Sequence, residues 1–329
     1  MYKYYYFFSL PMLLITNLLI FLNSSPFFMW MIMEMNLMCF MNIISIYKFL
    51  YSQILMNYFL IQSFNSYLFL FSTIMLNTNF FNNVMNFLII MAMLSKMGIP
   101  PFHMWYLNMM KQLNWIIFYL NSSLQKFIPL YITYSYVNKI NHYIFFFLIL
   151  MFLSPMMSLK FFSMKIIMSF SSMIQMIWII NLMMFNEKMW LSFFIFYNFI
   201  SLILILMFYS HNINYLYEMN SMKNNINTMF SMNLMIFSLA SIPPFTGFMN
   251  KWMFMDNMNL TNSMYMLMMM MIFSIINLYF YSRIMILNSM IFQLNLNKNF
   301  KFINMTTNNN KLNYMINFSI FFIFLYELF

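Results

Sequence analysis

Long apolar runs, separated by short polar segments, follow one another along almost the whole chain. A helix needs about 17 to 25 apolar residues to cross the hydrocarbon core of a bilayer, and about eleven runs in this sequence come near that length. Because the backbone cannot form hydrogen bonds to lipid, spanning segments of this kind are helices. The pattern predicts an all-α, polytopic membrane protein with about eleven transmembrane helices.

The predicted spans are Tyr6–Leu22, Phe27–Tyr47, Tyr58–Leu76, Val84–Trp105, Trp115–Val137, Tyr143–Leu159, Lys165–Phe185, Trp190–Tyr209, Met229–Met255, Ser263–Ile286 and Asn313–Leu328. Between the last two, the Asn- and Lys-rich segment Leu294–Lys311 is expected to be an exposed loop. No linker separates two soluble domains, so we expect a single membrane domain over residues 1–329.

Two of the spans are interrupted by the same motif, since residues 99–102 and 242–245 both read Ile-Pro-Pro-Phe. Adjacent prolines remove backbone donors and clash with the preceding turn, so each helix is predicted to break there. The chain has 2 glycines and 8 prolines, and both glycines and half of the prolines lie at these breaks. The residues concerned are Gly98, Pro100, Pro101, Pro243, Pro244 and Gly247.

The broken spans are the fourth and the ninth in order. They are an odd number of spans apart, so the two helices run in opposite directions across the membrane. Broken helices at matching positions of two inverted halves mark the site of transport in many secondary transporters. The sequence therefore favours inverted-topology repeats with a site at the breaks.

Four charged side chains stand out within the predicted spans, because a charge at the bilayer centre costs about 2.5 to 3.5 kcal/mol. They are Glu34 in the second span, Lys96 just before the first break, Lys126 in the fifth span and Lys251 just after the second break. Burial moves the pKa of a lysine towards neutrality, where the amine can gain and lose a proton. The four residues predict a proton relay through water held at the broken helices. The alternative is a structural Glu–Lys pair, or lysines that reach the membrane surface.

Three further basic residues lie in or next to predicted spans, and two of them, Lys165 and His103, are accessory candidates. Lys165 and Arg283 lie near span ends, where long side chains reach the interface, although Lys165 could extend the relay. His103 follows the first break and could either shuttle protons or form an ordinary interfacial hydrogen bond.

The composition supports the membrane assignment. The chain is 64% hydrophobic and 6% charged, which leaves too few charges to cover the surface of a soluble domain of 329 residues. The 47 methionines and 45 phenylalanines indicate an AT-rich mitochondrial gene in which ATA is read as methionine. We attribute the methionines to Leu and Ile positions filled by codon drift, and not to a metal site.

The net charge of +10 would suggest a nucleic-acid partner in a soluble protein, but here the lysines are spread through short loops. If there are eleven spans, the loops on the side of the N-terminus contain Lys3, Lys48, Lys111, Lys160, Lys223, Lys298, Lys301 and Lys311, and those on the other side contain Lys139 and Lys188. The positive-inside rule then places the N-terminus on the matrix side of the inner membrane. We expect contact with phospholipids and none with nucleic acid.

Several classes of site are excluded by residues that the chain lacks. Cys39 is the single cysteine, so the cysteines of this chain cannot form a disulfide, a zinc site or an iron–sulfur cluster. Three scattered histidines cannot supply the paired ligands of two haems, and two glycines cannot form a nucleotide-binding loop. We expect no metal and no redox cofactor in this chain, so any redox chemistry would belong to partners.

Short segments in this order and spacing resemble one known family: Trp30–Asn36, Tyr58–Gln62, Ala92–Trp105, Gln125–Pro129, Lys165–Trp178, Ser238–Trp252 and Asn277–Arg283. The family is that of the mitochondrially encoded NADH-ubiquinone oxidoreductase chain 2, an antiporter-like subunit in the membrane arm of respiratory complex I. The composition resembles that of insect members.

The resemblance implies proton translocation by Glu34 paired with Lys96, by a central Lys126 and by Lys251. It implies that other membrane-arm subunits are partners, and that NADH, FMN, iron–sulfur clusters and ubiquinone are bound by other subunits. Two positions depart from the family pattern. Gln175 stands where many relatives have histidine, and Ala240-Ser241 replace a glycine, which predicts a tighter second break.

Two other functions remain open at this point: a structural membrane-arm subunit whose buried charges hold neighbours in register, and a stand-alone cation/proton antiporter. Relay residues should face the protein interior at mid-membrane depth, whereas structural pairs should face a partner. An antiporter should work alone, whereas a subunit of a complex should be purified with many partners.

Overall fold

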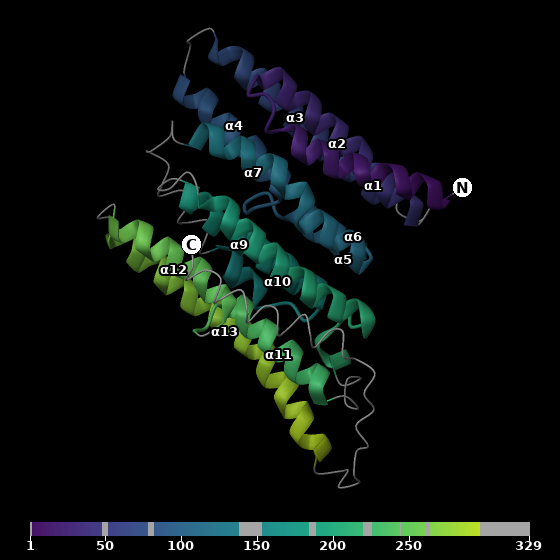
Figure 1. Ribbon diagram of the computed structural model, residues 1–329, viewed down its shortest axis with the longest axis vertical. Helices are drawn as coiled ribbons and strands as arrows, with labels where there is room; N and C mark the ends of the chain where they lie inside the picture. The colour runs from purple at the N-terminus through teal and green to yellow at the C-terminus, as the bar shows by residue number, and fades with distance from the viewer. Residues whose placement is uncertain are drawn as a thin grey trace. The chain divides into compact units, whose positions relative to one another are not determined.

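The computed structural model describes residues 2–47, 52–77, 82–137, 153–183, 189–219, 226–243, 245–260 and 264–296 (Figure 1). Regular structure in these ranges is helical, apart from an isolated antiparallel bridge between Ser163 and Tyr215. The predicted all-α class is confirmed for this part of the chain. The span Asn313–Leu328, most of Tyr143–Leu159, and Pro244 lie outside the described residues.

Within the described ranges, 5 helices are long and apolar enough to cross a membrane: Pro26–Ser45, Ser52–Leu76, Met164–Met183, Trp190–Ser210 and Leu267–Ile286. Phe8–Leu19 and Met229–Ala240 are apolar but shorter. The chain is therefore a multi-pass membrane protein, and the number of eleven spans stays a prediction.

The chain divides into two compact units, of which the first comprises Met1–Leu150 and Ser172–Glu187. Its helices are α1 (Tyr2–Leu19), α2 (Pro26–Tyr47), α3 (Ser52–Leu76), α4 (Asn82–Met97), α5 (Met104–Gln112), α6 (Trp115–Ser122), α7 (Leu124–Val137) and the later part of α9 (Met164–Met183). In this unit α2 packs against α1 and α3, while α4 packs against α3 and α7 (Figure 1). The first broken helix is thereby placed beside α7.

The second unit comprises Met151–Ser171 and Lys188–Phe329. It contains the start of α9, α10 (Trp190–Ser210), α11 (Ile226–Ala240), α12 (Thr246–Leu260) and α13 (Met264–Leu296). Here α11 packs against α10, α12 and α13. The sequence predicted that the exposed loop begins at Leu294. That boundary is wrong, because α13 continues to Leu296 and residues 294–296 are helical. The single membrane domain over residues 1–329 stays a prediction.

Arg283 ties α13 to the segment that precedes α9 within the second unit. Its guanidinium donates hydrogen bonds to the carbonyl oxygens of Leu159 and Phe161. Carbonyls just after a helical segment lack helical donors, and residues 153–158 are helical. Arg283 therefore stabilises this helix end. The sequence had indicated only that it lies near the end of a span.

The predicted span Trp115–Val137 consists of two helices, α6 and α7, separated at Ser123. The Tyr119 carbonyl accepts hydrogen bonds from the backbone N–H and the hydroxyl of Ser123, at 3.0 and 2.6 Å, and from the Ser122 hydroxyl at 3.1 Å. Hydroxyls that bond to the backbone in this way compete with the regular helix ladder. Lys126 therefore lies in the first turn of a helix and not in the middle of one.

The first break is a helix terminus of the Schellman type. The N–H of Gly98 donates to the Ser95 carbonyl at 3.2 Å, and the N–H of Ile99 donates to the Leu94 carbonyl at 3.1 Å. Gly98 has φ +70°, a left-handed conformation that glycine adopts without steric cost. The glycine is thus the residue that turns the chain out of α4.

The second break has the same hydrogen-bond pattern. The N–H of Ser241 donates to the Ser238 carbonyl at 3.0 Å, and the N–H of Ile242 donates to the Phe237 carbonyl at 3.4 Å. Ser241 takes the left-handed position at φ +56°, which costs a residue with a side chain about 1–2 kcal/mol. The missing glycine is accommodated by backbone strain in Ser241, and the turn is not the tighter one that the sequence predicted.

Close packing explains both glycines of the chain. A Cβ added to Gly98 would lie 2.5 Å from the Cβ of Tyr106 on α5, and one added to Gly247 would overlap the carbonyl oxygen of Ser238 on α11. Gly98 therefore lets an aromatic side chain pack on the first break. Gly247 lets the start of α12 approach the end of α11.

We expect Gly247→Ala to destabilise the full chain by about 1–3 kcal/mol or more, because the new methyl group meets a backbone oxygen that cannot rotate aside. Thermal unfolding of the chain in lipid measures the loss. Ser241→Gly is the control at the same break, and it should be neutral or stabilising because φ +56° suits glycine. A Gly247→Ala protein as stable as the parent would contradict the close approach of α11 and α12.

Candidate proton-transfer site

Lys96 lies in the last turn of α4, immediately before the first break, and its side chain is 8% exposed. The C-terminus of a helix has partial negative charge, which favours a cation there. The ammonium donates to the thioether sulfur of Met33 on α2 at 3.3 Å. A thioether is a weak acceptor, and the charge of Glu34, the residue after Met33 on α2, also acts on Lys96.

Glu34 is half-buried on α2, and its carboxylate accepts a hydrogen bond from the Ser66 hydroxyl of α3. The same hydroxyl also lies 2.6 Å from the Ser63 carbonyl. Three neighbouring helices, α2, α3 and α4, therefore contribute one polar side chain each. We call Glu34, Ser66 and Lys96 the acid–base cluster.

Side chains from two other helices donate hydrogen bonds to carbonyl groups of the last turn before the first break, where the residue four positions after Lys96 is a proline without an N–H. The Lys96 carbonyl accepts a hydrogen bond from the Gln62 amide of α3 at 3.1 Å. The Ser95 carbonyl accepts one from the Trp105 indole of α5, also at 3.1 Å. These bonds fix the backbone from which the Lys96 side chain projects.

Lys126 is 2% exposed and lies in the first turn of α7. Its ammonium donates to the Ser172 hydroxyl of α9 at 2.9 Å and lies 4.6 Å from the ring centre of Tyr106 on α5. The Tyr106 hydroxyl is 3.0 Å from the same Ser172 oxygen. Because the N-terminus of a helix disfavours a cation, this lysine lacks the support that the helix terminus gives to Lys96.

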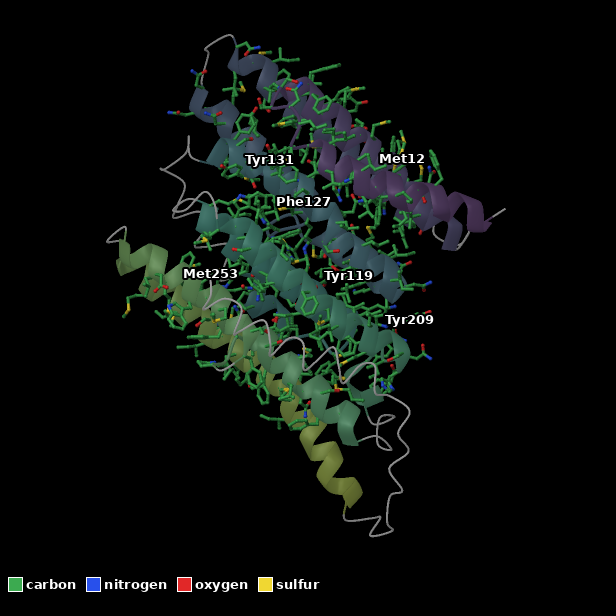
Figure 2. The ribbon with its side chains drawn as sticks, in the orientation of Figure 1. Met12, Tyr119, Phe127, Tyr131, Tyr209 and Met253 are labelled. Carbon is green, nitrogen blue, oxygen red and sulfur yellow. The ribbon has the colours of Figure 1, made fainter. Side chains whose placement is uncertain are left out.

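Contacts on both sides of Lys126 in the sequence hold the start of α7 in place. Gln125 and Asn36 of α2 form two reciprocal amide hydrogen bonds, each of 3.2 Å. Phe127 and Tyr131, one turn apart on α7 (Figure 2), both pack against the Phe21 ring, with ring centres 5.6 and 5.2 Å from it. These contacts therefore fix the backbone from which the Lys126 side chain projects.

Lys251 lies on α12 in the second unit and is 9% exposed. Its ammonium is 3.5 Å from the carbonyl oxygen of Ala240, the last residue of α11. As at Lys96, the cation lies at the negative end of a helix that stops at a break. The lysines of the two breaks thus have the same relation to a helix terminus, although one precedes its break in the sequence and the other follows it.

The accessory candidates lie at helix ends. His103 precedes α5 and is buried, with its ring Nδ1 3.2 Å from the Pro101 carbonyl oxygen. Lys165 is the second residue of α9 and is partly exposed. Gln175 is half-buried on the same helix. Lys165 and Lys251 belong to the second unit, whereas His103 and the other candidates belong to the first.

Sequence reasoning missed the polar partners of these charges. Gln62 and Ser66 are four residues apart in one apolar span, a spacing that places both on one face of a helix, so this pair could have been recognised. Ser172 and Tyr106 carried no such signal, because the chain has 23 tyrosines and many of its serines bond to their own helix.

The arrangement suits proton transfer between neighbouring side chains. The acid–base cluster places a hydroxyl against a carboxylate, and a second hydroxyl lies between Lys126 and a phenol. A hydroxyl both donates and accepts hydrogen bonds, so it can connect groups that gain and lose a proton.

Comparison with known proteins shows clear similarity. Residues 24–277 match the family described as NADH:quinone oxidoreductase/Mrp antiporter, TM. The chain is 31% identical to NADH-ubiquinone oxidoreductase chain 2 of Anopheles gambiae, over 88% of this chain and 86% of that protein. It is 34% identical to the protein of the same name from Aedes aegypti, over 66% and 63%. Its fold is similar to that of a chain of respiratory complex I from Thermus thermophilus, with a TM-score of 0.70 and 10% identity, covering 90% of this chain and 71% of that one.

We expect Gln62→Leu to destabilise the chain by about 1–3 kcal/mol, because the buried Lys96 carbonyl would lose its side-chain donor. Denaturation of the full chain in lipid or detergent measures the change. Ser63→Ala is the control on the same helix. Its hydroxyl bonds to the Leu60 carbonyl of its own helix, so the effect should stay within about 0.5 kcal/mol. Equal stabilities of the two variants would show that the break does not depend on Gln62.

Proposed function

The chain belongs to the NADH-ubiquinone oxidoreductase chain 2 family, and we propose that it translocates protons in the membrane arm of respiratory complex I, across the mitochondrial inner membrane. The proposal depends chiefly on one observation, the burial of three lysines at helix interruptions. Lys96, Lys126 and Lys251 are 8%, 2% and 9% exposed. Ionisable residues within membrane-spanning bundles are costly, and they commonly mark the paths of ions and protons.

The partners of Lys126 are suited to reversible protonation. Its ammonium is held by a neutral hydroxyl and an aromatic ring. When the amine loses its proton, neither partner is left as an unpaired buried charge. In a dry ion pair, by contrast, the loss of one charge leaves the other uncompensated, at a cost of about 3–5 kcal/mol. This difference favours a proton carrier over a purely structural charge.

In the proposed mechanism Glu34 and Lys96 exchange protons at the first break, Lys126 is the central carrier and Lys251 exchanges protons at the second break. Lys165 and His103 are accessory. Electron transfer from NADH to ubiquinone takes place in other subunits, which hold FMN and the iron–sulfur clusters. Electrostatic coupling along the membrane arm then changes the protonation of the lysines. The partners of this chain are neighbouring membrane-arm subunits and phospholipids.

The topology proposed with this function has about eleven spans in two inverted halves, with the N-terminus on the matrix side. The shared geometry of the breaks supports the repeat. Gly98 and Ser241 both have left-handed backbones, and both directly precede the sequence Ile-Pro-Pro-Phe. Two unrelated interruptions would not be expected to have the same backbone turn at the same position relative to the Ile-Pro-Pro-Phe sequence.

We expect Lys96→Met to lower the rate of proton pumping by the assembled complex about tenfold or more, because methionine fills the space and carries no proton. Acidification of vesicles containing the complex, driven by NADH and a ubiquinone analogue, measures the rate, and native electrophoresis measures assembly. Lys111→Met is the control, since Lys111 is exposed on α5 and its replacement should leave pumping unchanged.

Full pumping by an assembled Lys96→Met complex would remove Lys96 from the mechanism. Poor assembly, with normal pumping by each complex that does assemble, would favour the structural subunit. Cation or proton exchange by the purified chain alone would favour the stand-alone antiporter.

A further inference from the structure

Tyr106 connects the first break to Lys126. Its Cβ packs so closely on Gly98 that a Cβ added to the glycine would lie 2.5 Å away. At the other end of the side chain, the hydroxyl is 3.0 Å from the Ser172 oxygen, and this oxygen accepts a hydrogen bond from Lys126 at 2.9 Å. A single aromatic side chain thus reaches from the left-handed residue of the break to the hydroxyl that holds the lysine.

The ring of Tyr106 also contacts the charge directly. The Lys126 nitrogen lies 4.6 Å from the ring centre, within the distance of about 6 Å at which the negative face of a ring attracts a cation. Tyr106 is 1% exposed and Ser172 is 0% exposed, so water screens this attraction only weakly. The ring and the hydroxyl are the partners of this ammonium in the described part of the chain.

Lys126 has a particular need for such partners. It lies in the first turn of α7, where the partial positive charge of the helix N-terminus opposes an ammonium. Lys96 lies instead in the last turn of α4, and the ammonium of Lys251, a residue of α12, lies at the C-terminal end of α11, so carbonyl groups support both cations. Side chains must therefore stabilise the ammonium of Lys126, whereas helix termini stabilise those of Lys96 and Lys251.

We propose that Tyr106 and Ser172 are positioning residues for Lys126, which hold its ammonium at a fixed place on the proton path. This inference rests on the proposed function, because it gives both residues a part in proton transfer through Lys126. Ser172 accepts from the protonated amine, and the Tyr106 hydroxyl bonds to Ser172 while its ring faces the charge. Gly98 leaves the space that allows the ring to take this position.

The test measures NADH-driven proton pumping per assembled complex in lipid vesicles, together with KM for a ubiquinone analogue. Ser172→Ala removes the hydrogen-bond acceptor, and Tyr106→Leu removes both the ring and the hydroxyl. Each should lower the maximum pumping rate about tenfold, with KM unchanged. Tyr106→Phe keeps the ring beside the ammonium and should lose only about two- to threefold.

Two control variants remove buried side chains of the same size elsewhere. Ser171→Ala alters the residue next to Ser172, whose hydroxyl bonds to the Met168 carbonyl of its own helix at 2.7 Å. Tyr136→Leu truncates a buried tyrosine near the end of α7. Both should pump like the parent per assembled complex, even where thermal stability falls. A rate loss in these controls equal to that of Ser172→Ala and Tyr106→Leu would overturn the positioning role.

Lys126→Met separates this inference from the proposed function. If Lys126→Met stops pumping while Ser172→Ala and Tyr106→Leu pump like the parent, the positioning role is overturned and the function stands. If Lys126→Met pumps normally, Lys126 is removed from the proposed path, and the positioning role falls with it. Should Tyr106→Leu fail to assemble, Ser172→Ala and Tyr106→Phe decide the result.

Discussion

The structure depends on how an ammonium group is stabilised inside a bundle of apolar helices. An uninterrupted helix uses its carbonyl groups for its own hydrogen bonds, so it offers a buried cation almost nothing. A helix that stops leaves up to four carbonyls without helical partners, together with the negative end of its dipole. Lys96 lies in the last turn of such a helix, and Lys251 donates to the last residue of another. The interruptions that weaken the fold are therefore also what makes these two charges tolerable.

The two breaks show how one backbone turn can be built from different residues. Both use a pair of backbone hydrogen bonds that leads the chain into a left-handed residue, glycine at 98 and serine at 241. Around the first break, Gln62 and Trp105 of neighbouring helices donate to the carbonyl oxygens of Lys96 and Ser95. Around the second, Lys251 itself reaches a terminal carbonyl. The carbonyls at the helix end thus receive neutral donors from other helices in one unit, and in the other unit they receive the charged residue together with the Ser241 hydroxyl.

Lys126 is stabilised by side chains and not by a helix terminus. Its interruption, at Ser123, lies on the N-terminal side of the helix that carries it, so the backbone opposes the charge. A hydroxyl and an aromatic ring, contributed by helices distant in the sequence, take the place of the carbonyl groups. Such partners bond to a cation but carry no charge of their own. That property suits the role of proton carrier that we propose for Lys126.

The sequence by itself determined the helical class and the place of the two Ile-Pro-Pro-Phe breaks, because these follow from the length of apolar runs and from the missing N–H of proline. It also singled out Glu34 and the three lysines, since a charge in an apolar run stands out. The sequence did not reveal the interruption at Ser123, which arises from competing hydrogen bonds to one carbonyl. Nor did it reveal which side chains meet each charge. Helices that are apolar on nearly every side do not specify their own rotation, so only the packing of α5 and α9 around α7 could decide that Tyr106 and Ser172 meet Lys126.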